Sequence, residues 1–513
     1  MKKHYILGLD IGTTSAKAII FDRNGNVHTE HEIPYPLSHP QPGWVEQDPD
    51  EIEQAAKRAI KIVLSKSNLA NGTLIGVGIS AAMHSLILLD ANHTPLTPSI
   101  IWADGRSVEQ ANKMKNTEGL SIYLKTGTPI HPMSPFIKLL WMKETKYEPY
   151  QKAAKIISIK EYILLKWFGK MVVDYSIASA TGLFNIHKLM WEPSALALAG
   201  ISEEQLSKPV PPTEIFQGMK ENIALEMGIP LDLPFVIGGS DGPLANLGIG
   251  AIDESDVAIT IGTSGAIRKM TSRPQTDSNQ DIFCYAFSQD LWVMGGPTNN
   301  GGIVFRWLKT VLGEKETDLA LRQEKDVYEL LSELAAKAKP GSNDLLFLPY
   351  LNGERAPHWD AFARGSYIGL TESHQKPHLI RAGLEGVIYN IYTISETLER
   401  LGGPSQTLLA SGGFARSPLW LQILADIFGK EVKVPRSHQS SAWGACWTAL
   451  YALNEVNSFY QIKRSIPMDQ SFLPNDRNHK VYQDLYPIYK DLYAVLKPQF
   501  QRLADLQSER VSS

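Results

Sequence analysis

The organisation of this chain follows from one stretch near its start, Tyr5-Ile-Leu-Gly-Leu-Asp-Ile-Gly-Thr-Thr-Ser-Ala-Lys-Ala-Ile-Ile20. The apolar run 5–9 has the length of a buried strand, and apolar residues resume at 18–20 after a turn of glycine and hydroxyl residues. The pattern predicts a tight hairpin. Its turn suits phosphate oxygens, and Asp10 at its mouth suits a magnesium ion that accompanies phosphate. The alternative is an ordinary hairpin in which Asp10 accepts from turn N–H groups.

Length and composition limit the class of protein. With 513 residues, the chain is long enough for about two to four domains. The net charge of −4 offers no basic field for nucleic acid or for an anionic membrane. Cys284 and Cys446 lack metal-ligand spacing, so neither a disulfide framework nor a zinc site is indicated. The first apolar run ends at Asp10, and no segment approaches ~18 apolar residues, so a cytoplasmic protein without a membrane span is expected.

The opening pattern occurs a second time. The segment Val257-Ala-Ile-Thr-Ile-Gly-Thr-Ser-Gly-Ala-Ile267 again has an apolar strand, a Gly-Thr-Ser turn and a second strand. Ile261-Gly-Thr-Ser264 aligns with Ile11-Gly-Thr-Thr14. This repetition indicates two copies of one fold. Two such hairpins that face each other across a cleft would hold successive phosphates of one nucleotide.

Two strand–turn–helix junctions add further candidates. The apolar segment 234–239 predicts a strand that runs into Ser240-Asp241, with a helix of small residues after it. Leu408 to Phe414 predicts a strand that ends in a Gly-Gly turn, and Ser417 then begins a helix whose N-terminus suits a nucleotide. A plain helix cap is the alternative at both junctions. Asp48-Pro-Asp-Glu51 predicts another helix start, and 441–453 predicts a buried helix of small residues.

With these motifs in place, the chain resembles the FGGY carbohydrate kinases over nearly all of residues 1–455. Two segments diagnostic of that family are present, Met133-Ser-Pro-Phe-Ile-Lys-Leu-Leu-Trp141 and the region from Gly365 to Glu385. The resemblance implies an α/β, two-domain ribonuclease-H-like fold, as in actin and hexokinase, with an interdomain cleft. It implies an N-terminal domain at 1–250 on the substrate and phosphate side, a nucleotide-side domain at 251–455 and a helical tail at 456–513. ATP and Mg²⁺ are the implied cofactors.

Within the family, the chain is most similar to the gluconate kinases. The similarity rests on the segments 80–85, 101–106, 295–302 and 347–357, some of which xylulose kinases share. The implied reaction is ATP-dependent phosphorylation of the terminal hydroxyl of D-gluconate to 6-phospho-D-gluconate. A kinase for xylulose or another ketose or polyol is the alternative, and an actin-like or chaperone-like ATPase is a remoter one. No Gly-x-x-x-x-Gly-Lys-Ser/Thr motif occurs, which excludes the unrelated P-loop type of gluconate kinase.

The resemblance also implies roles for individual residues. Asp241 is the expected general base, and its alternative role is to cap the next helix. Asp10 is expected to hold magnesium through water. The expected ATP-binding residues are Thr13, Thr14, Ser15, Lys17, Thr263, Gly302, Arg306, Gly413 and Ser417. Among them, Lys17 is alternatively a solvated charge and Arg306 a surface arginine.

The substrate is expected to meet His84, Asp104 and Asp241, with Met83 and Trp102 as walls. Arg106 is the candidate for a bidentate pair with a sugar-acid carboxylate. It is alternatively a structural arginine of its loop, and His84 is alternatively a buried structural histidine. The expected partner is a small sugar or sugar acid, with no nucleic acid and no membrane. The sequence leaves the choice between a monomer and a homodimer open.

Overall fold

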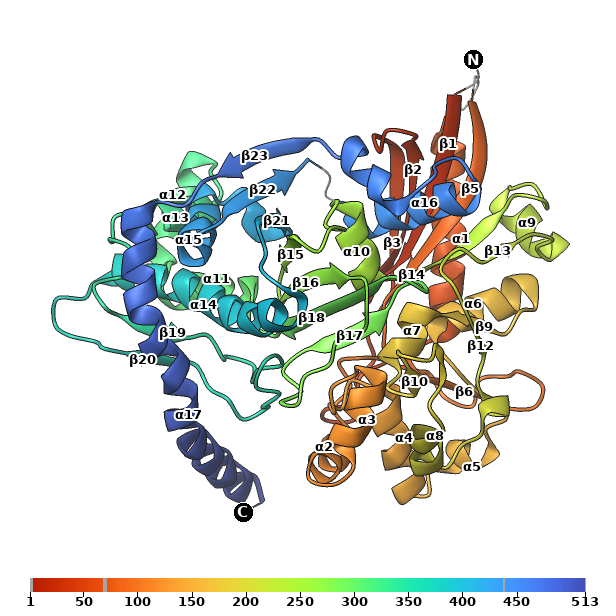
Figure 1. The fold of residues 1–513 in the computed structure, drawn as a ribbon, viewed down its shortest axis with the longest axis horizontal. Coiled ribbons are helices and arrows are strands. Elements are labelled where there is room, and N and C mark those ends of the chain that lie inside the picture. The colour runs from red at the N-terminus through yellow and green to blue at the C-terminus, as the bar shows by residue number, and fades with distance from the viewer. Residues whose placement is uncertain (1–2, 68–71, 437–438, 513) are drawn as a thin grey trace. The chain divides into compact units, whose positions relative to one another are not determined.

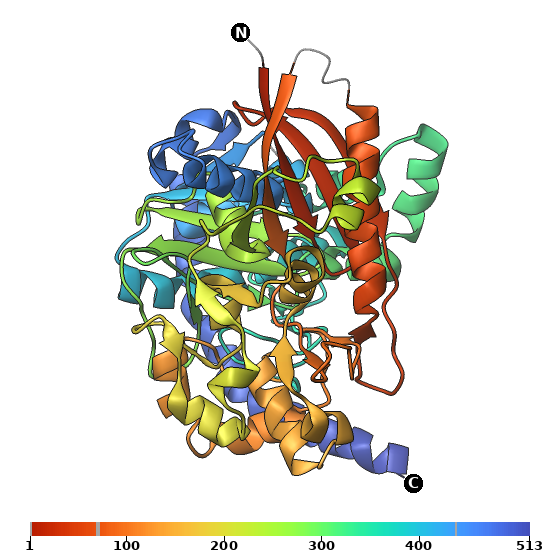
Figure 2. The same cartoon turned by 90° about the vertical axis from the view of Figure 1, so that its right-hand side faces the viewer.

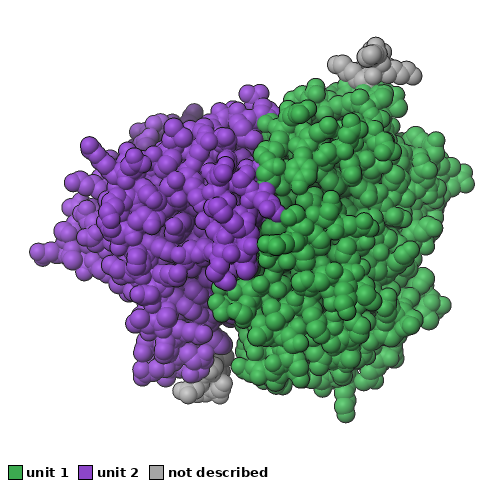
Figure 3. Space-filling view, viewed as in Figure 1, with its two compact units in different colours: residues 1–253, 270–294, 439–466 green, residues 254–269, 295–438, 467–513 purple. Residues whose placement is uncertain are grey.

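The structure, a computed structural model, describes residues 3–67, 72–436 and 439–512. The chain divides into two compact units, which Figure 3 shows in separate colours. Unit 1 comprises Met1–Asp253, Met270–Met294 and Gln439–Ile466, and unit 2 comprises Glu254–Lys269, Gly295–His438 and Pro467–Ser513. The units are therefore interleaved along the sequence, whereas the domains expected above are contiguous ranges.

Unit 1 is built mainly from the first half of the chain (Figure 1). Its strands are β1 (Lys3–Ile11), β2 (Ser15–Asp22), β3 (Val27–Pro34), β4 (Glu46–Gln47), β5 (Gly72–Ala81), β6 (Ile87–Leu89), β7 (Ser99–Ile100), β8 (Lys155–Ile157), β9 (Val172–Asp174), β10 (Phe184–Asn185), β11 (Met190–Trp191), β12 (Lys208–Val210), β13 (Ile215–Phe216), β14 (Phe235–Ser240) and β17 (Phe283–Ala286). Its helices are α1 (Pro49–Lys66), α2 (Val108–Lys115), α3 (Gly119–Thr126), α4 (Pro135–Glu144), α5 (Glu148–Lys152), α6 (Ile159–Phe168), α7 (Tyr175–Ala180), α8 (Pro193–Ala199), α9 (Glu221–Met227), α10 (Asp241–Gly248) and α16 (Ser440–Ala452), with short 3₁₀ turns at Glu203–Gln205 and Phe459–Ser465.

The main sheet of unit 1 has the order β13-β14-β5-β1-β2-β3. The predicted hairpin is confirmed, because β1 and β2 pair antiparallel with Ile11 opposite Ala16. β1, β5 and β14 run parallel, with Asp10 opposite Ser80 and Ser240 opposite Ala81. The carboxyl ends of these three strands therefore lie together at one edge of the sheet.

The two faces of β1 pack against different helices. Its odd-numbered residues, such as Leu7 and Leu9, share an apolar cluster with α1 residues Ile52 and Ala56. On the opposite face, Ile6 shares a second cluster with residues of α16. Figure 2 shows α1 as the long orange helix that lies along the strands. Because side chains alternate between faces along a strand, the even-numbered Asp10 lies on the α16 face.

Glycines allow α16 to approach the sheet closely. A Cβ atom at Gly8 would lie 2.7 Å from the carbonyl oxygen of Ala442, and one at Gly78 would lie 2.1 Å from that of Ala445. On the other side of the helix, a Cβ at Gly444 would lie 2.0 Å from the carbonyl oxygen of Leu244 in α10. The prediction of a buried helix of small residues is thus confirmed. The glycines let the backbone of α16 contact the sheet on one side and the backbone of α10 on the other.

Unit 2 contains the second hairpin, in a sheet whose strands follow the order β17-β18-β16-β15-β21-β22-β23, of which β17 is assigned to unit 1. Its strands are β15 (Asp256–Ile261), β16 (Gly265–Thr271), β18 (Trp292–Thr298), β19 (Leu346–Leu348), β20 (Ser366–Ile368), β21 (Thr407–Ser411), β22 (Glu431–Pro435) and β23 (Met468–Phe472), and β16 and β18 each extend into residues assigned to unit 1. Its helices are α11 (Gly302–Leu312), α12 (Glu314–Gln323), α13 (Val327–Ala335), α14 (Lys376–Gly402), α15 (Pro418–Phe428) and α17 (Asp476–Ser512), with a 3₁₀ turn at Gly413–Arg416.

The predicted helix starts are also confirmed. Asp48 accepts hydrogen bonds from the backbone N–H groups of Asp50 and Glu51 at the start of α1. Ser417 accepts from the N–H of Trp420 at the start of α15, at 3.3 Å. Among the helices of the described residues, none combines the length and the apolar composition needed to cross a bilayer.

Candidate active site

The predicted site residues of unit 1 gather where three parallel strands end. Asp10 lies next to the end of β1, Met83 and His84 follow β5 closely, and Asp241 follows β14 directly. In sheets of parallel strands, ligands bind at the carboxyl edge, because loops and helix N-termini converge there. The sheet topology therefore brings together residues that are far apart in the sequence.

Asp10 is oriented by hydroxyl groups from two elements. Its Oδ1 accepts from Ser80 Oγ in β5 and its Oδ2 accepts from Ser441 Oγ in α16, each at 2.7 Å. The residue is partly exposed, so its carboxylate stays accessible to a ligand. The close approach of α16 to β1 and β5 is what brings Ser441 to this carboxylate.

The donors around Asp10 fit one kind of metal site. Among the described residues, no group of three or more His, Cys, Asp or Glu side chains could hold an ion by itself. A single carboxylate with two hydroxyls nearby suits Mg²⁺, which keeps several waters and takes further ligands from substrate phosphates. Asp10 fits that use and does not fit a zinc or calcium cage.

The Gly12–Ser15 turn is held by side chains from outside the hairpin. Tyr35 Oη donates to the carbonyl oxygen of Gly12 at 2.6 Å, and Gln47 Nε2 donates to that of Thr13 at 2.8 Å. Trp102 Nε1 donates to Thr13 Oγ1 at 3.0 Å. Because Thr13 Oγ accepts this bond, its own hydrogen is available for a phosphate oxygen. Trp102, which is predicted to line the substrate site, is thus hydrogen-bonded directly to the turn that is predicted to bind phosphate.

Two other predicted phosphate ligands already have partners on β3. Ser15 Oγ donates to Glu32 at 2.6 Å, and Lys17 Nζ lies 3.3 Å from the second carboxylate oxygen of Glu32. The Ser15 hydrogen bond and the Lys17 charge lower the pKa of Glu32, so this carboxylate stays ionised. Thr14, by contrast, is exposed. Thr13 and Thr14 are therefore better placed than Ser15 and Lys17 to bind an anion.

Asp241 is the first residue of α10. Its Oδ1 accepts from the N–H of Gly242 at 2.8 Å, and the residue is partly exposed. Ser240, which precedes it, is fully buried. The backbone is therefore anchored in the core while the carboxylate faces outward at the carboxyl edge of the sheet.

His84 has an unusual backbone conformation and a defined tautomer. Its φ of 67° lies in the left-handed region, which costs free energy for a residue other than glycine. Its Nδ1 lies 2.6 Å from the carbonyl oxygen of Ala180, which can only accept, so Nδ1 carries a proton. Its Nε2 lies 3.5 Å from Tyr285 Oη. The imidazole is therefore fixed in orientation.

Asp104 and Arg106 are paired with each other. Arg106 Nε and Nη2 each lie 2.8 Å from an oxygen of Asp104, and Nη2 also donates to Glu46. The guanidinium stacks on Trp44 with 3.6 Å to the ring centroid, and its side chain is fully buried. Asp104 further accepts from the N–H of Val45 at 2.7 Å. These contacts favour the structural interpretation of Arg106, because two carboxylates of the protein already bind its Nε and Nη2 atoms, although Nη1 has no hydrogen-bond partner among the described residues.

In unit 2, the second glycine turn packs on the start of a helix. The N–H of Gly302 donates to the carbonyl oxygen of Gly262 at 2.7 Å, and that of Ile303 donates to Thr263 at 3.0 Å. A Cβ at Gly302 would lie 2.6 Å from the Gly262 oxygen. Thr263 and Gly302, predicted for the same side of a triphosphate, are therefore adjacent.

The predicted adenosine residues lie next to the same strand ends. β15 and β21 are parallel, and Thr260 Oγ1 lies 2.9 Å from Ser411 Oγ. Gly412, with φ 95°, turns the chain after β21, and a Cβ at Gly413 would meet no atom within 4 Å. Ser417 is occupied as the cap of α15, and Arg306 is exposed one turn into α11.

Two parts of the sequence match known protein domains. Residues 5–248 match the N-terminal domain of the FGGY family of carbohydrate kinases, and residues 257–453 match the C-terminal domain. The chain belongs to the FGGY family of carbohydrate kinases. As a kinase of this family, it is a phosphotransferase that uses ATP.

Individual relatives of this FGGY kinase are similar along the whole chain. A protein named gluconokinase from Bacillus subtilis is 47% identical over 505 residues, which is 98% of each chain. Two solved structures from Lactobacillus acidophilus each match with a TM-score of 0.92 and 36% identity, and each covers 98% of this chain and 100% of its own. One is titled a gluconate kinase and the other a ligand-bound xylulose kinase.

Sequence reasoning missed one buried carboxylate in unit 2 of this kinase. Glu354 accepts from Thr298 Oγ1 at 2.6 Å, from the N–H of Asn299 at 2.8 Å and from Asn390 Nδ2 at 3.0 Å. Burial raises the pKa of Glu354 above its ordinary value, although the hydrogen bonds from Thr298 and Asn299 oppose the shift. The network fixes the segment that leads into Gly302. Glu354 lies in a motif used above only for family similarity, and its neighbours Asn352, Gly353 and Arg355 gave no local signal of burial.

We expect Arg106→Ala to lower stability and to raise KM for gluconate and for a neutral sugar by similar factors. The change leaves Asp104 and Glu46 without their cation, and breaking such a buried pair costs about 3–5 kcal/mol. The loop that carries Trp102 would also loosen. Denaturant unfolding and steady-state kinetics with both sugars measure these effects, with Arg58→Ala, at an exposed position of α1, as the control. A selective rise in KM for gluconate would instead assign Arg106 to the substrate carboxylate.

Proposed function

We propose that this kinase transfers the γ-phosphoryl group of ATP to the terminal hydroxyl of D-gluconate and yields 6-phospho-D-gluconate. The observation that carries the proposal is the 47% identity to a protein named gluconokinase over 98% of both chains. The titles of the two solved structures name gluconate in one case and xylulose in the other, so these structures establish the fold but do not distinguish the two sugars. The choice of gluconate rests on the higher sequence identity to the gluconokinase. A xylulose kinase is therefore the second candidate.

Asp241 is proposed as the general base. Phosphoryl transfer needs alignment, charge neutralisation and a group that takes the proton of the attacking hydroxyl. Asp241 presents its carboxylate at the carboxyl edge of the sheet, and one of its oxygens is oriented by the N–H of Gly242. The other oxygen would accept the proton as the alcohol oxygen attacks the γ-phosphorus.

Asp10 is proposed to hold Mg²⁺ through water. The ion would supply positive charge to the phosphate oxygens during transfer. The contribution of the chain is to fix the carboxylate, and the hydroxyls of Ser80 and Ser441 do so from both sides. Both hydroxyls donate to Asp10, so its remaining lone pairs can accept from ordered water.

The proposed nucleotide ligands lie in both glycine turns. Thr13 and Thr14 would donate to phosphate oxygens in the first turn, with Ser15 and Lys17 in supporting positions through Glu32. In unit 2, Thr263 and Gly302 would meet phosphate. Gly413 would lie near the adenosine, because it offers an open backbone surface, with Ser417 and Arg306 nearby in sequence.

The proposed sugar ligands are His84, Met83 and Trp102, together with Asp241. His84 donates from Nδ1 to the protein, and its Nε2, which lies 3.5 Å from Tyr285 Oη, is the atom proposed to meet a substrate hydroxyl or carboxylate. Asp104 and Arg106 would act indirectly, because their pairing fixes the loop on which Trp102 lies. With ATP as the donor, the cytoplasm is the proposed compartment of the reaction.

A substrate panel tests the proposal. The purified protein is assayed with ATP and magnesium against gluconate, xylulose, glycerol, ribulose and fuculose, with ADP release as the readout. We expect kcat/KM for gluconate to exceed each of the others by more than about tenfold, a difference of ~1.4 kcal/mol in transition-state stabilisation. A preference for xylulose would establish the second candidate. ADP release that no sugar stimulates would point to an ATPase.

A further inference from the structure

β14 contains an extra residue between Val236 and Gly239, a few positions before Asp241. Its pairing with β5 advances from Val236 opposite Gly78 to Gly239 opposite Ser80, which is the signature of a β-bulge. Gly238 within the bulge has φ 62°, and a Cβ there would lie 2.1 Å from the carbonyl oxygen of Ile79. A bulge interrupts the regular ladder, so its carbonyl groups need other donors.

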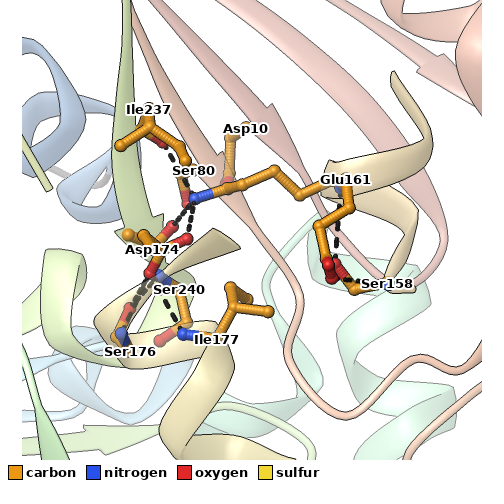
Figure 4. Close-up of polar contacts among 11 residues, drawn as sticks. Asp10, Ser80, Ser158, Glu161, Asp174, Ser176, Ile177, Ile237 and Ser240 are labelled. Atoms are coloured by element: carbon orange, nitrogen blue, oxygen red, sulfur yellow. Dashed lines mark hydrogen bonds and ion pairs between the residues drawn. The ribbon is translucent and has the colours of Figure 1, made fainter. Parts of the chain in front are cut away.

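Lys160 of α6 supplies those donors. Its side chain is 1% exposed. Its Nζ donates to the carbonyl oxygens of Ile237 at 2.9 Å and Gly239 at 2.8 Å, and to Asp174 Oδ2 at 2.8 Å. An ammonium group has three N–H bonds, so each of them has an acceptor. Figure 4 shows the side chain of Asp174 and the carbonyl group of Ile237 directed toward the same nitrogen atom.

Asp174 extends the network to the residue before Asp241. Its Oδ1 accepts from the N–H of Ile177 at 3.0 Å and from Ser176 Oγ at 2.5 Å, as cap of α7. Ser176 Oγ in turn accepts from the N–H of Ser240 at 2.7 Å. The end of β14 is therefore held at the carbonyls of 237 and 239 and at the N–H of 240 (Figure 4).

We propose that the buried Lys160–Asp174 pair is a positioning device that fixes the end of β14 and so aims Asp241 at the acceptor hydroxyl. The inference rests on the proposed role of Asp241 as the base. A buried ion pair is commonly no more stabilising than an apolar pair of the same volume. An apolar pair, however, cannot donate to the two strand carbonyls, so these directional bonds are the specific contribution of Lys160.

Electrostatics supports the same arrangement. The charged groups that face Lys160 are Asp174, Glu161 and Asp241. Burial lowers the pKa of Lys160, whereas these carboxylates raise it. Burial also raises the pKa of Glu161 to about 7, so that Asp174 and Asp241 are the principal anions near the ammonium. Because Asp241 raises the pKa of Lys160, the coulombic interaction between these two side chains is attractive.

The test compares Lys160→Met, Ser176→Ala and the control Lys57→Met. Lys57 is also buried in unit 1, where it pairs with Glu53 and Glu226. Glu53 in turn accepts from Trp167 Nε1, at the opposite end of α6 from Lys160. We expect Lys160→Met to lower kcat about 100-fold, because small misplacements of a catalytic group have effects of that size. KM for ATP and for gluconate should stay within about threefold of the wild-type values, because contacts made equally in the ground state and the transition state are unaffected. The acid limb of the kcat–pH profile should move to higher pH.

The two other variants separate positioning from stability. Ser176→Ala removes the acceptor of the Ser240 N–H and the hydroxyl that donates to Asp174, but keeps the Lys160 bonds to the strand carbonyls. It should therefore lower kcat only about tenfold, a smaller displacement of the same strand end. Lys57→Met should lower Tm and leave kcat unchanged. Hydrogen exchange should be faster at residues 239–242 in Lys160→Met and Ser176→Ala, and unchanged there in Lys57→Met.

A normal kcat in both Lys160→Met and Ser176→Ala would overturn the inference, as would an equal loss of kcat in Lys57→Met. If Lys160→Met does not fold, Ser176→Ala decides alone through kcat and hydrogen exchange. Asp241→Asn, assayed in parallel, separates the positioning role of the Lys160–Asp174 pair from the proposed role of Asp241 as the base. An inactive Asp241→Asn beside fully active network variants rejects only the positioning role, and an active Asp241→Asn rejects the proposed base itself.

Discussion

Replacing Asp241 by asparagine is expected to lower kcat for gluconate phosphorylation by about 10²–10⁴-fold, the contribution of a general base. The amide keeps the size of the carboxylate and still accepts from the N–H of Gly242, so the start of α10 is preserved. It cannot take the proton of the sugar hydroxyl. The Kd for ATP should therefore stay within about threefold of the wild-type value, because no predicted nucleotide contact is altered.

Steady-state kinetics and calorimetric ATP titration measure the two effects. The matched control is Asp232→Asn, an exposed aspartate just before β14 in the chain. The control should be fully active. Turnover close to normal in Asp241→Asn would remove the base from the mechanism and would leave Asp241 as a helix-capping residue.

Gly78→Ala is expected to destabilise the protein strongly, although the substitution adds only one methyl group. The new Cβ would lie 2.1 Å from the carbonyl oxygen of Ala445 and 2.9 Å from the backbone nitrogen of Cys446, and no rotamer change can relieve a clash with backbone. Overpacking typically lowers the free energy of unfolding by about 1–3 kcal/mol and sometimes more, and we expect a loss at the upper end of this range. Chemical denaturation would measure the loss.

Activity is a second readout, because the clash at residue 78 would displace α16. The helix carries Ser441, which orients Asp10, so Gly78→Ala should also lower kcat at a temperature where the protein is still folded. Gly105→Ala serves as the control for stability, because its Cβ would meet its nearest atom at 3.5 Å, an ordinary contact. Equal unfolding midpoints for the two variants would contradict the close packing of α16 on β5.

The sequence predicted the elements that carry the site, because their signals are local. The apolar run of β1, the Asp48 cap of α1 and the Ser417 cap of α15 each depend on a few neighbouring residues. The hairpin repeat was also visible. Its two turns differ by one residue, however, since Ile11 pairs with Ala16 whereas Ile261 pairs with Gly265. A pattern of residue types does not define loop register.

The contacts that the sequence could not predict join distant residues. Ser80 and Ser441 lie 70 and 431 positions from Asp10, and nothing in their own neighbourhoods marks them as its partners. Arg106 shows the converse. Its residue type suits a substrate carboxylate, but only the folded chain shows that its guanidinium already forms ion pairs with Asp104 and Glu46.

The interleaving of the two units has a consequence during synthesis. Unit 1 needs α16, yet the ribosome makes this helix only after most of unit 2 has emerged. Many proteins complete their N-terminal domain first, while translation continues. Here the newly made residues 1–253 would wait with the α16 face of their sheet uncovered, including the surface around Gly8 and Gly78. A nascent chain stalled before residue 439 should therefore be bound by chaperones and digested readily by protease.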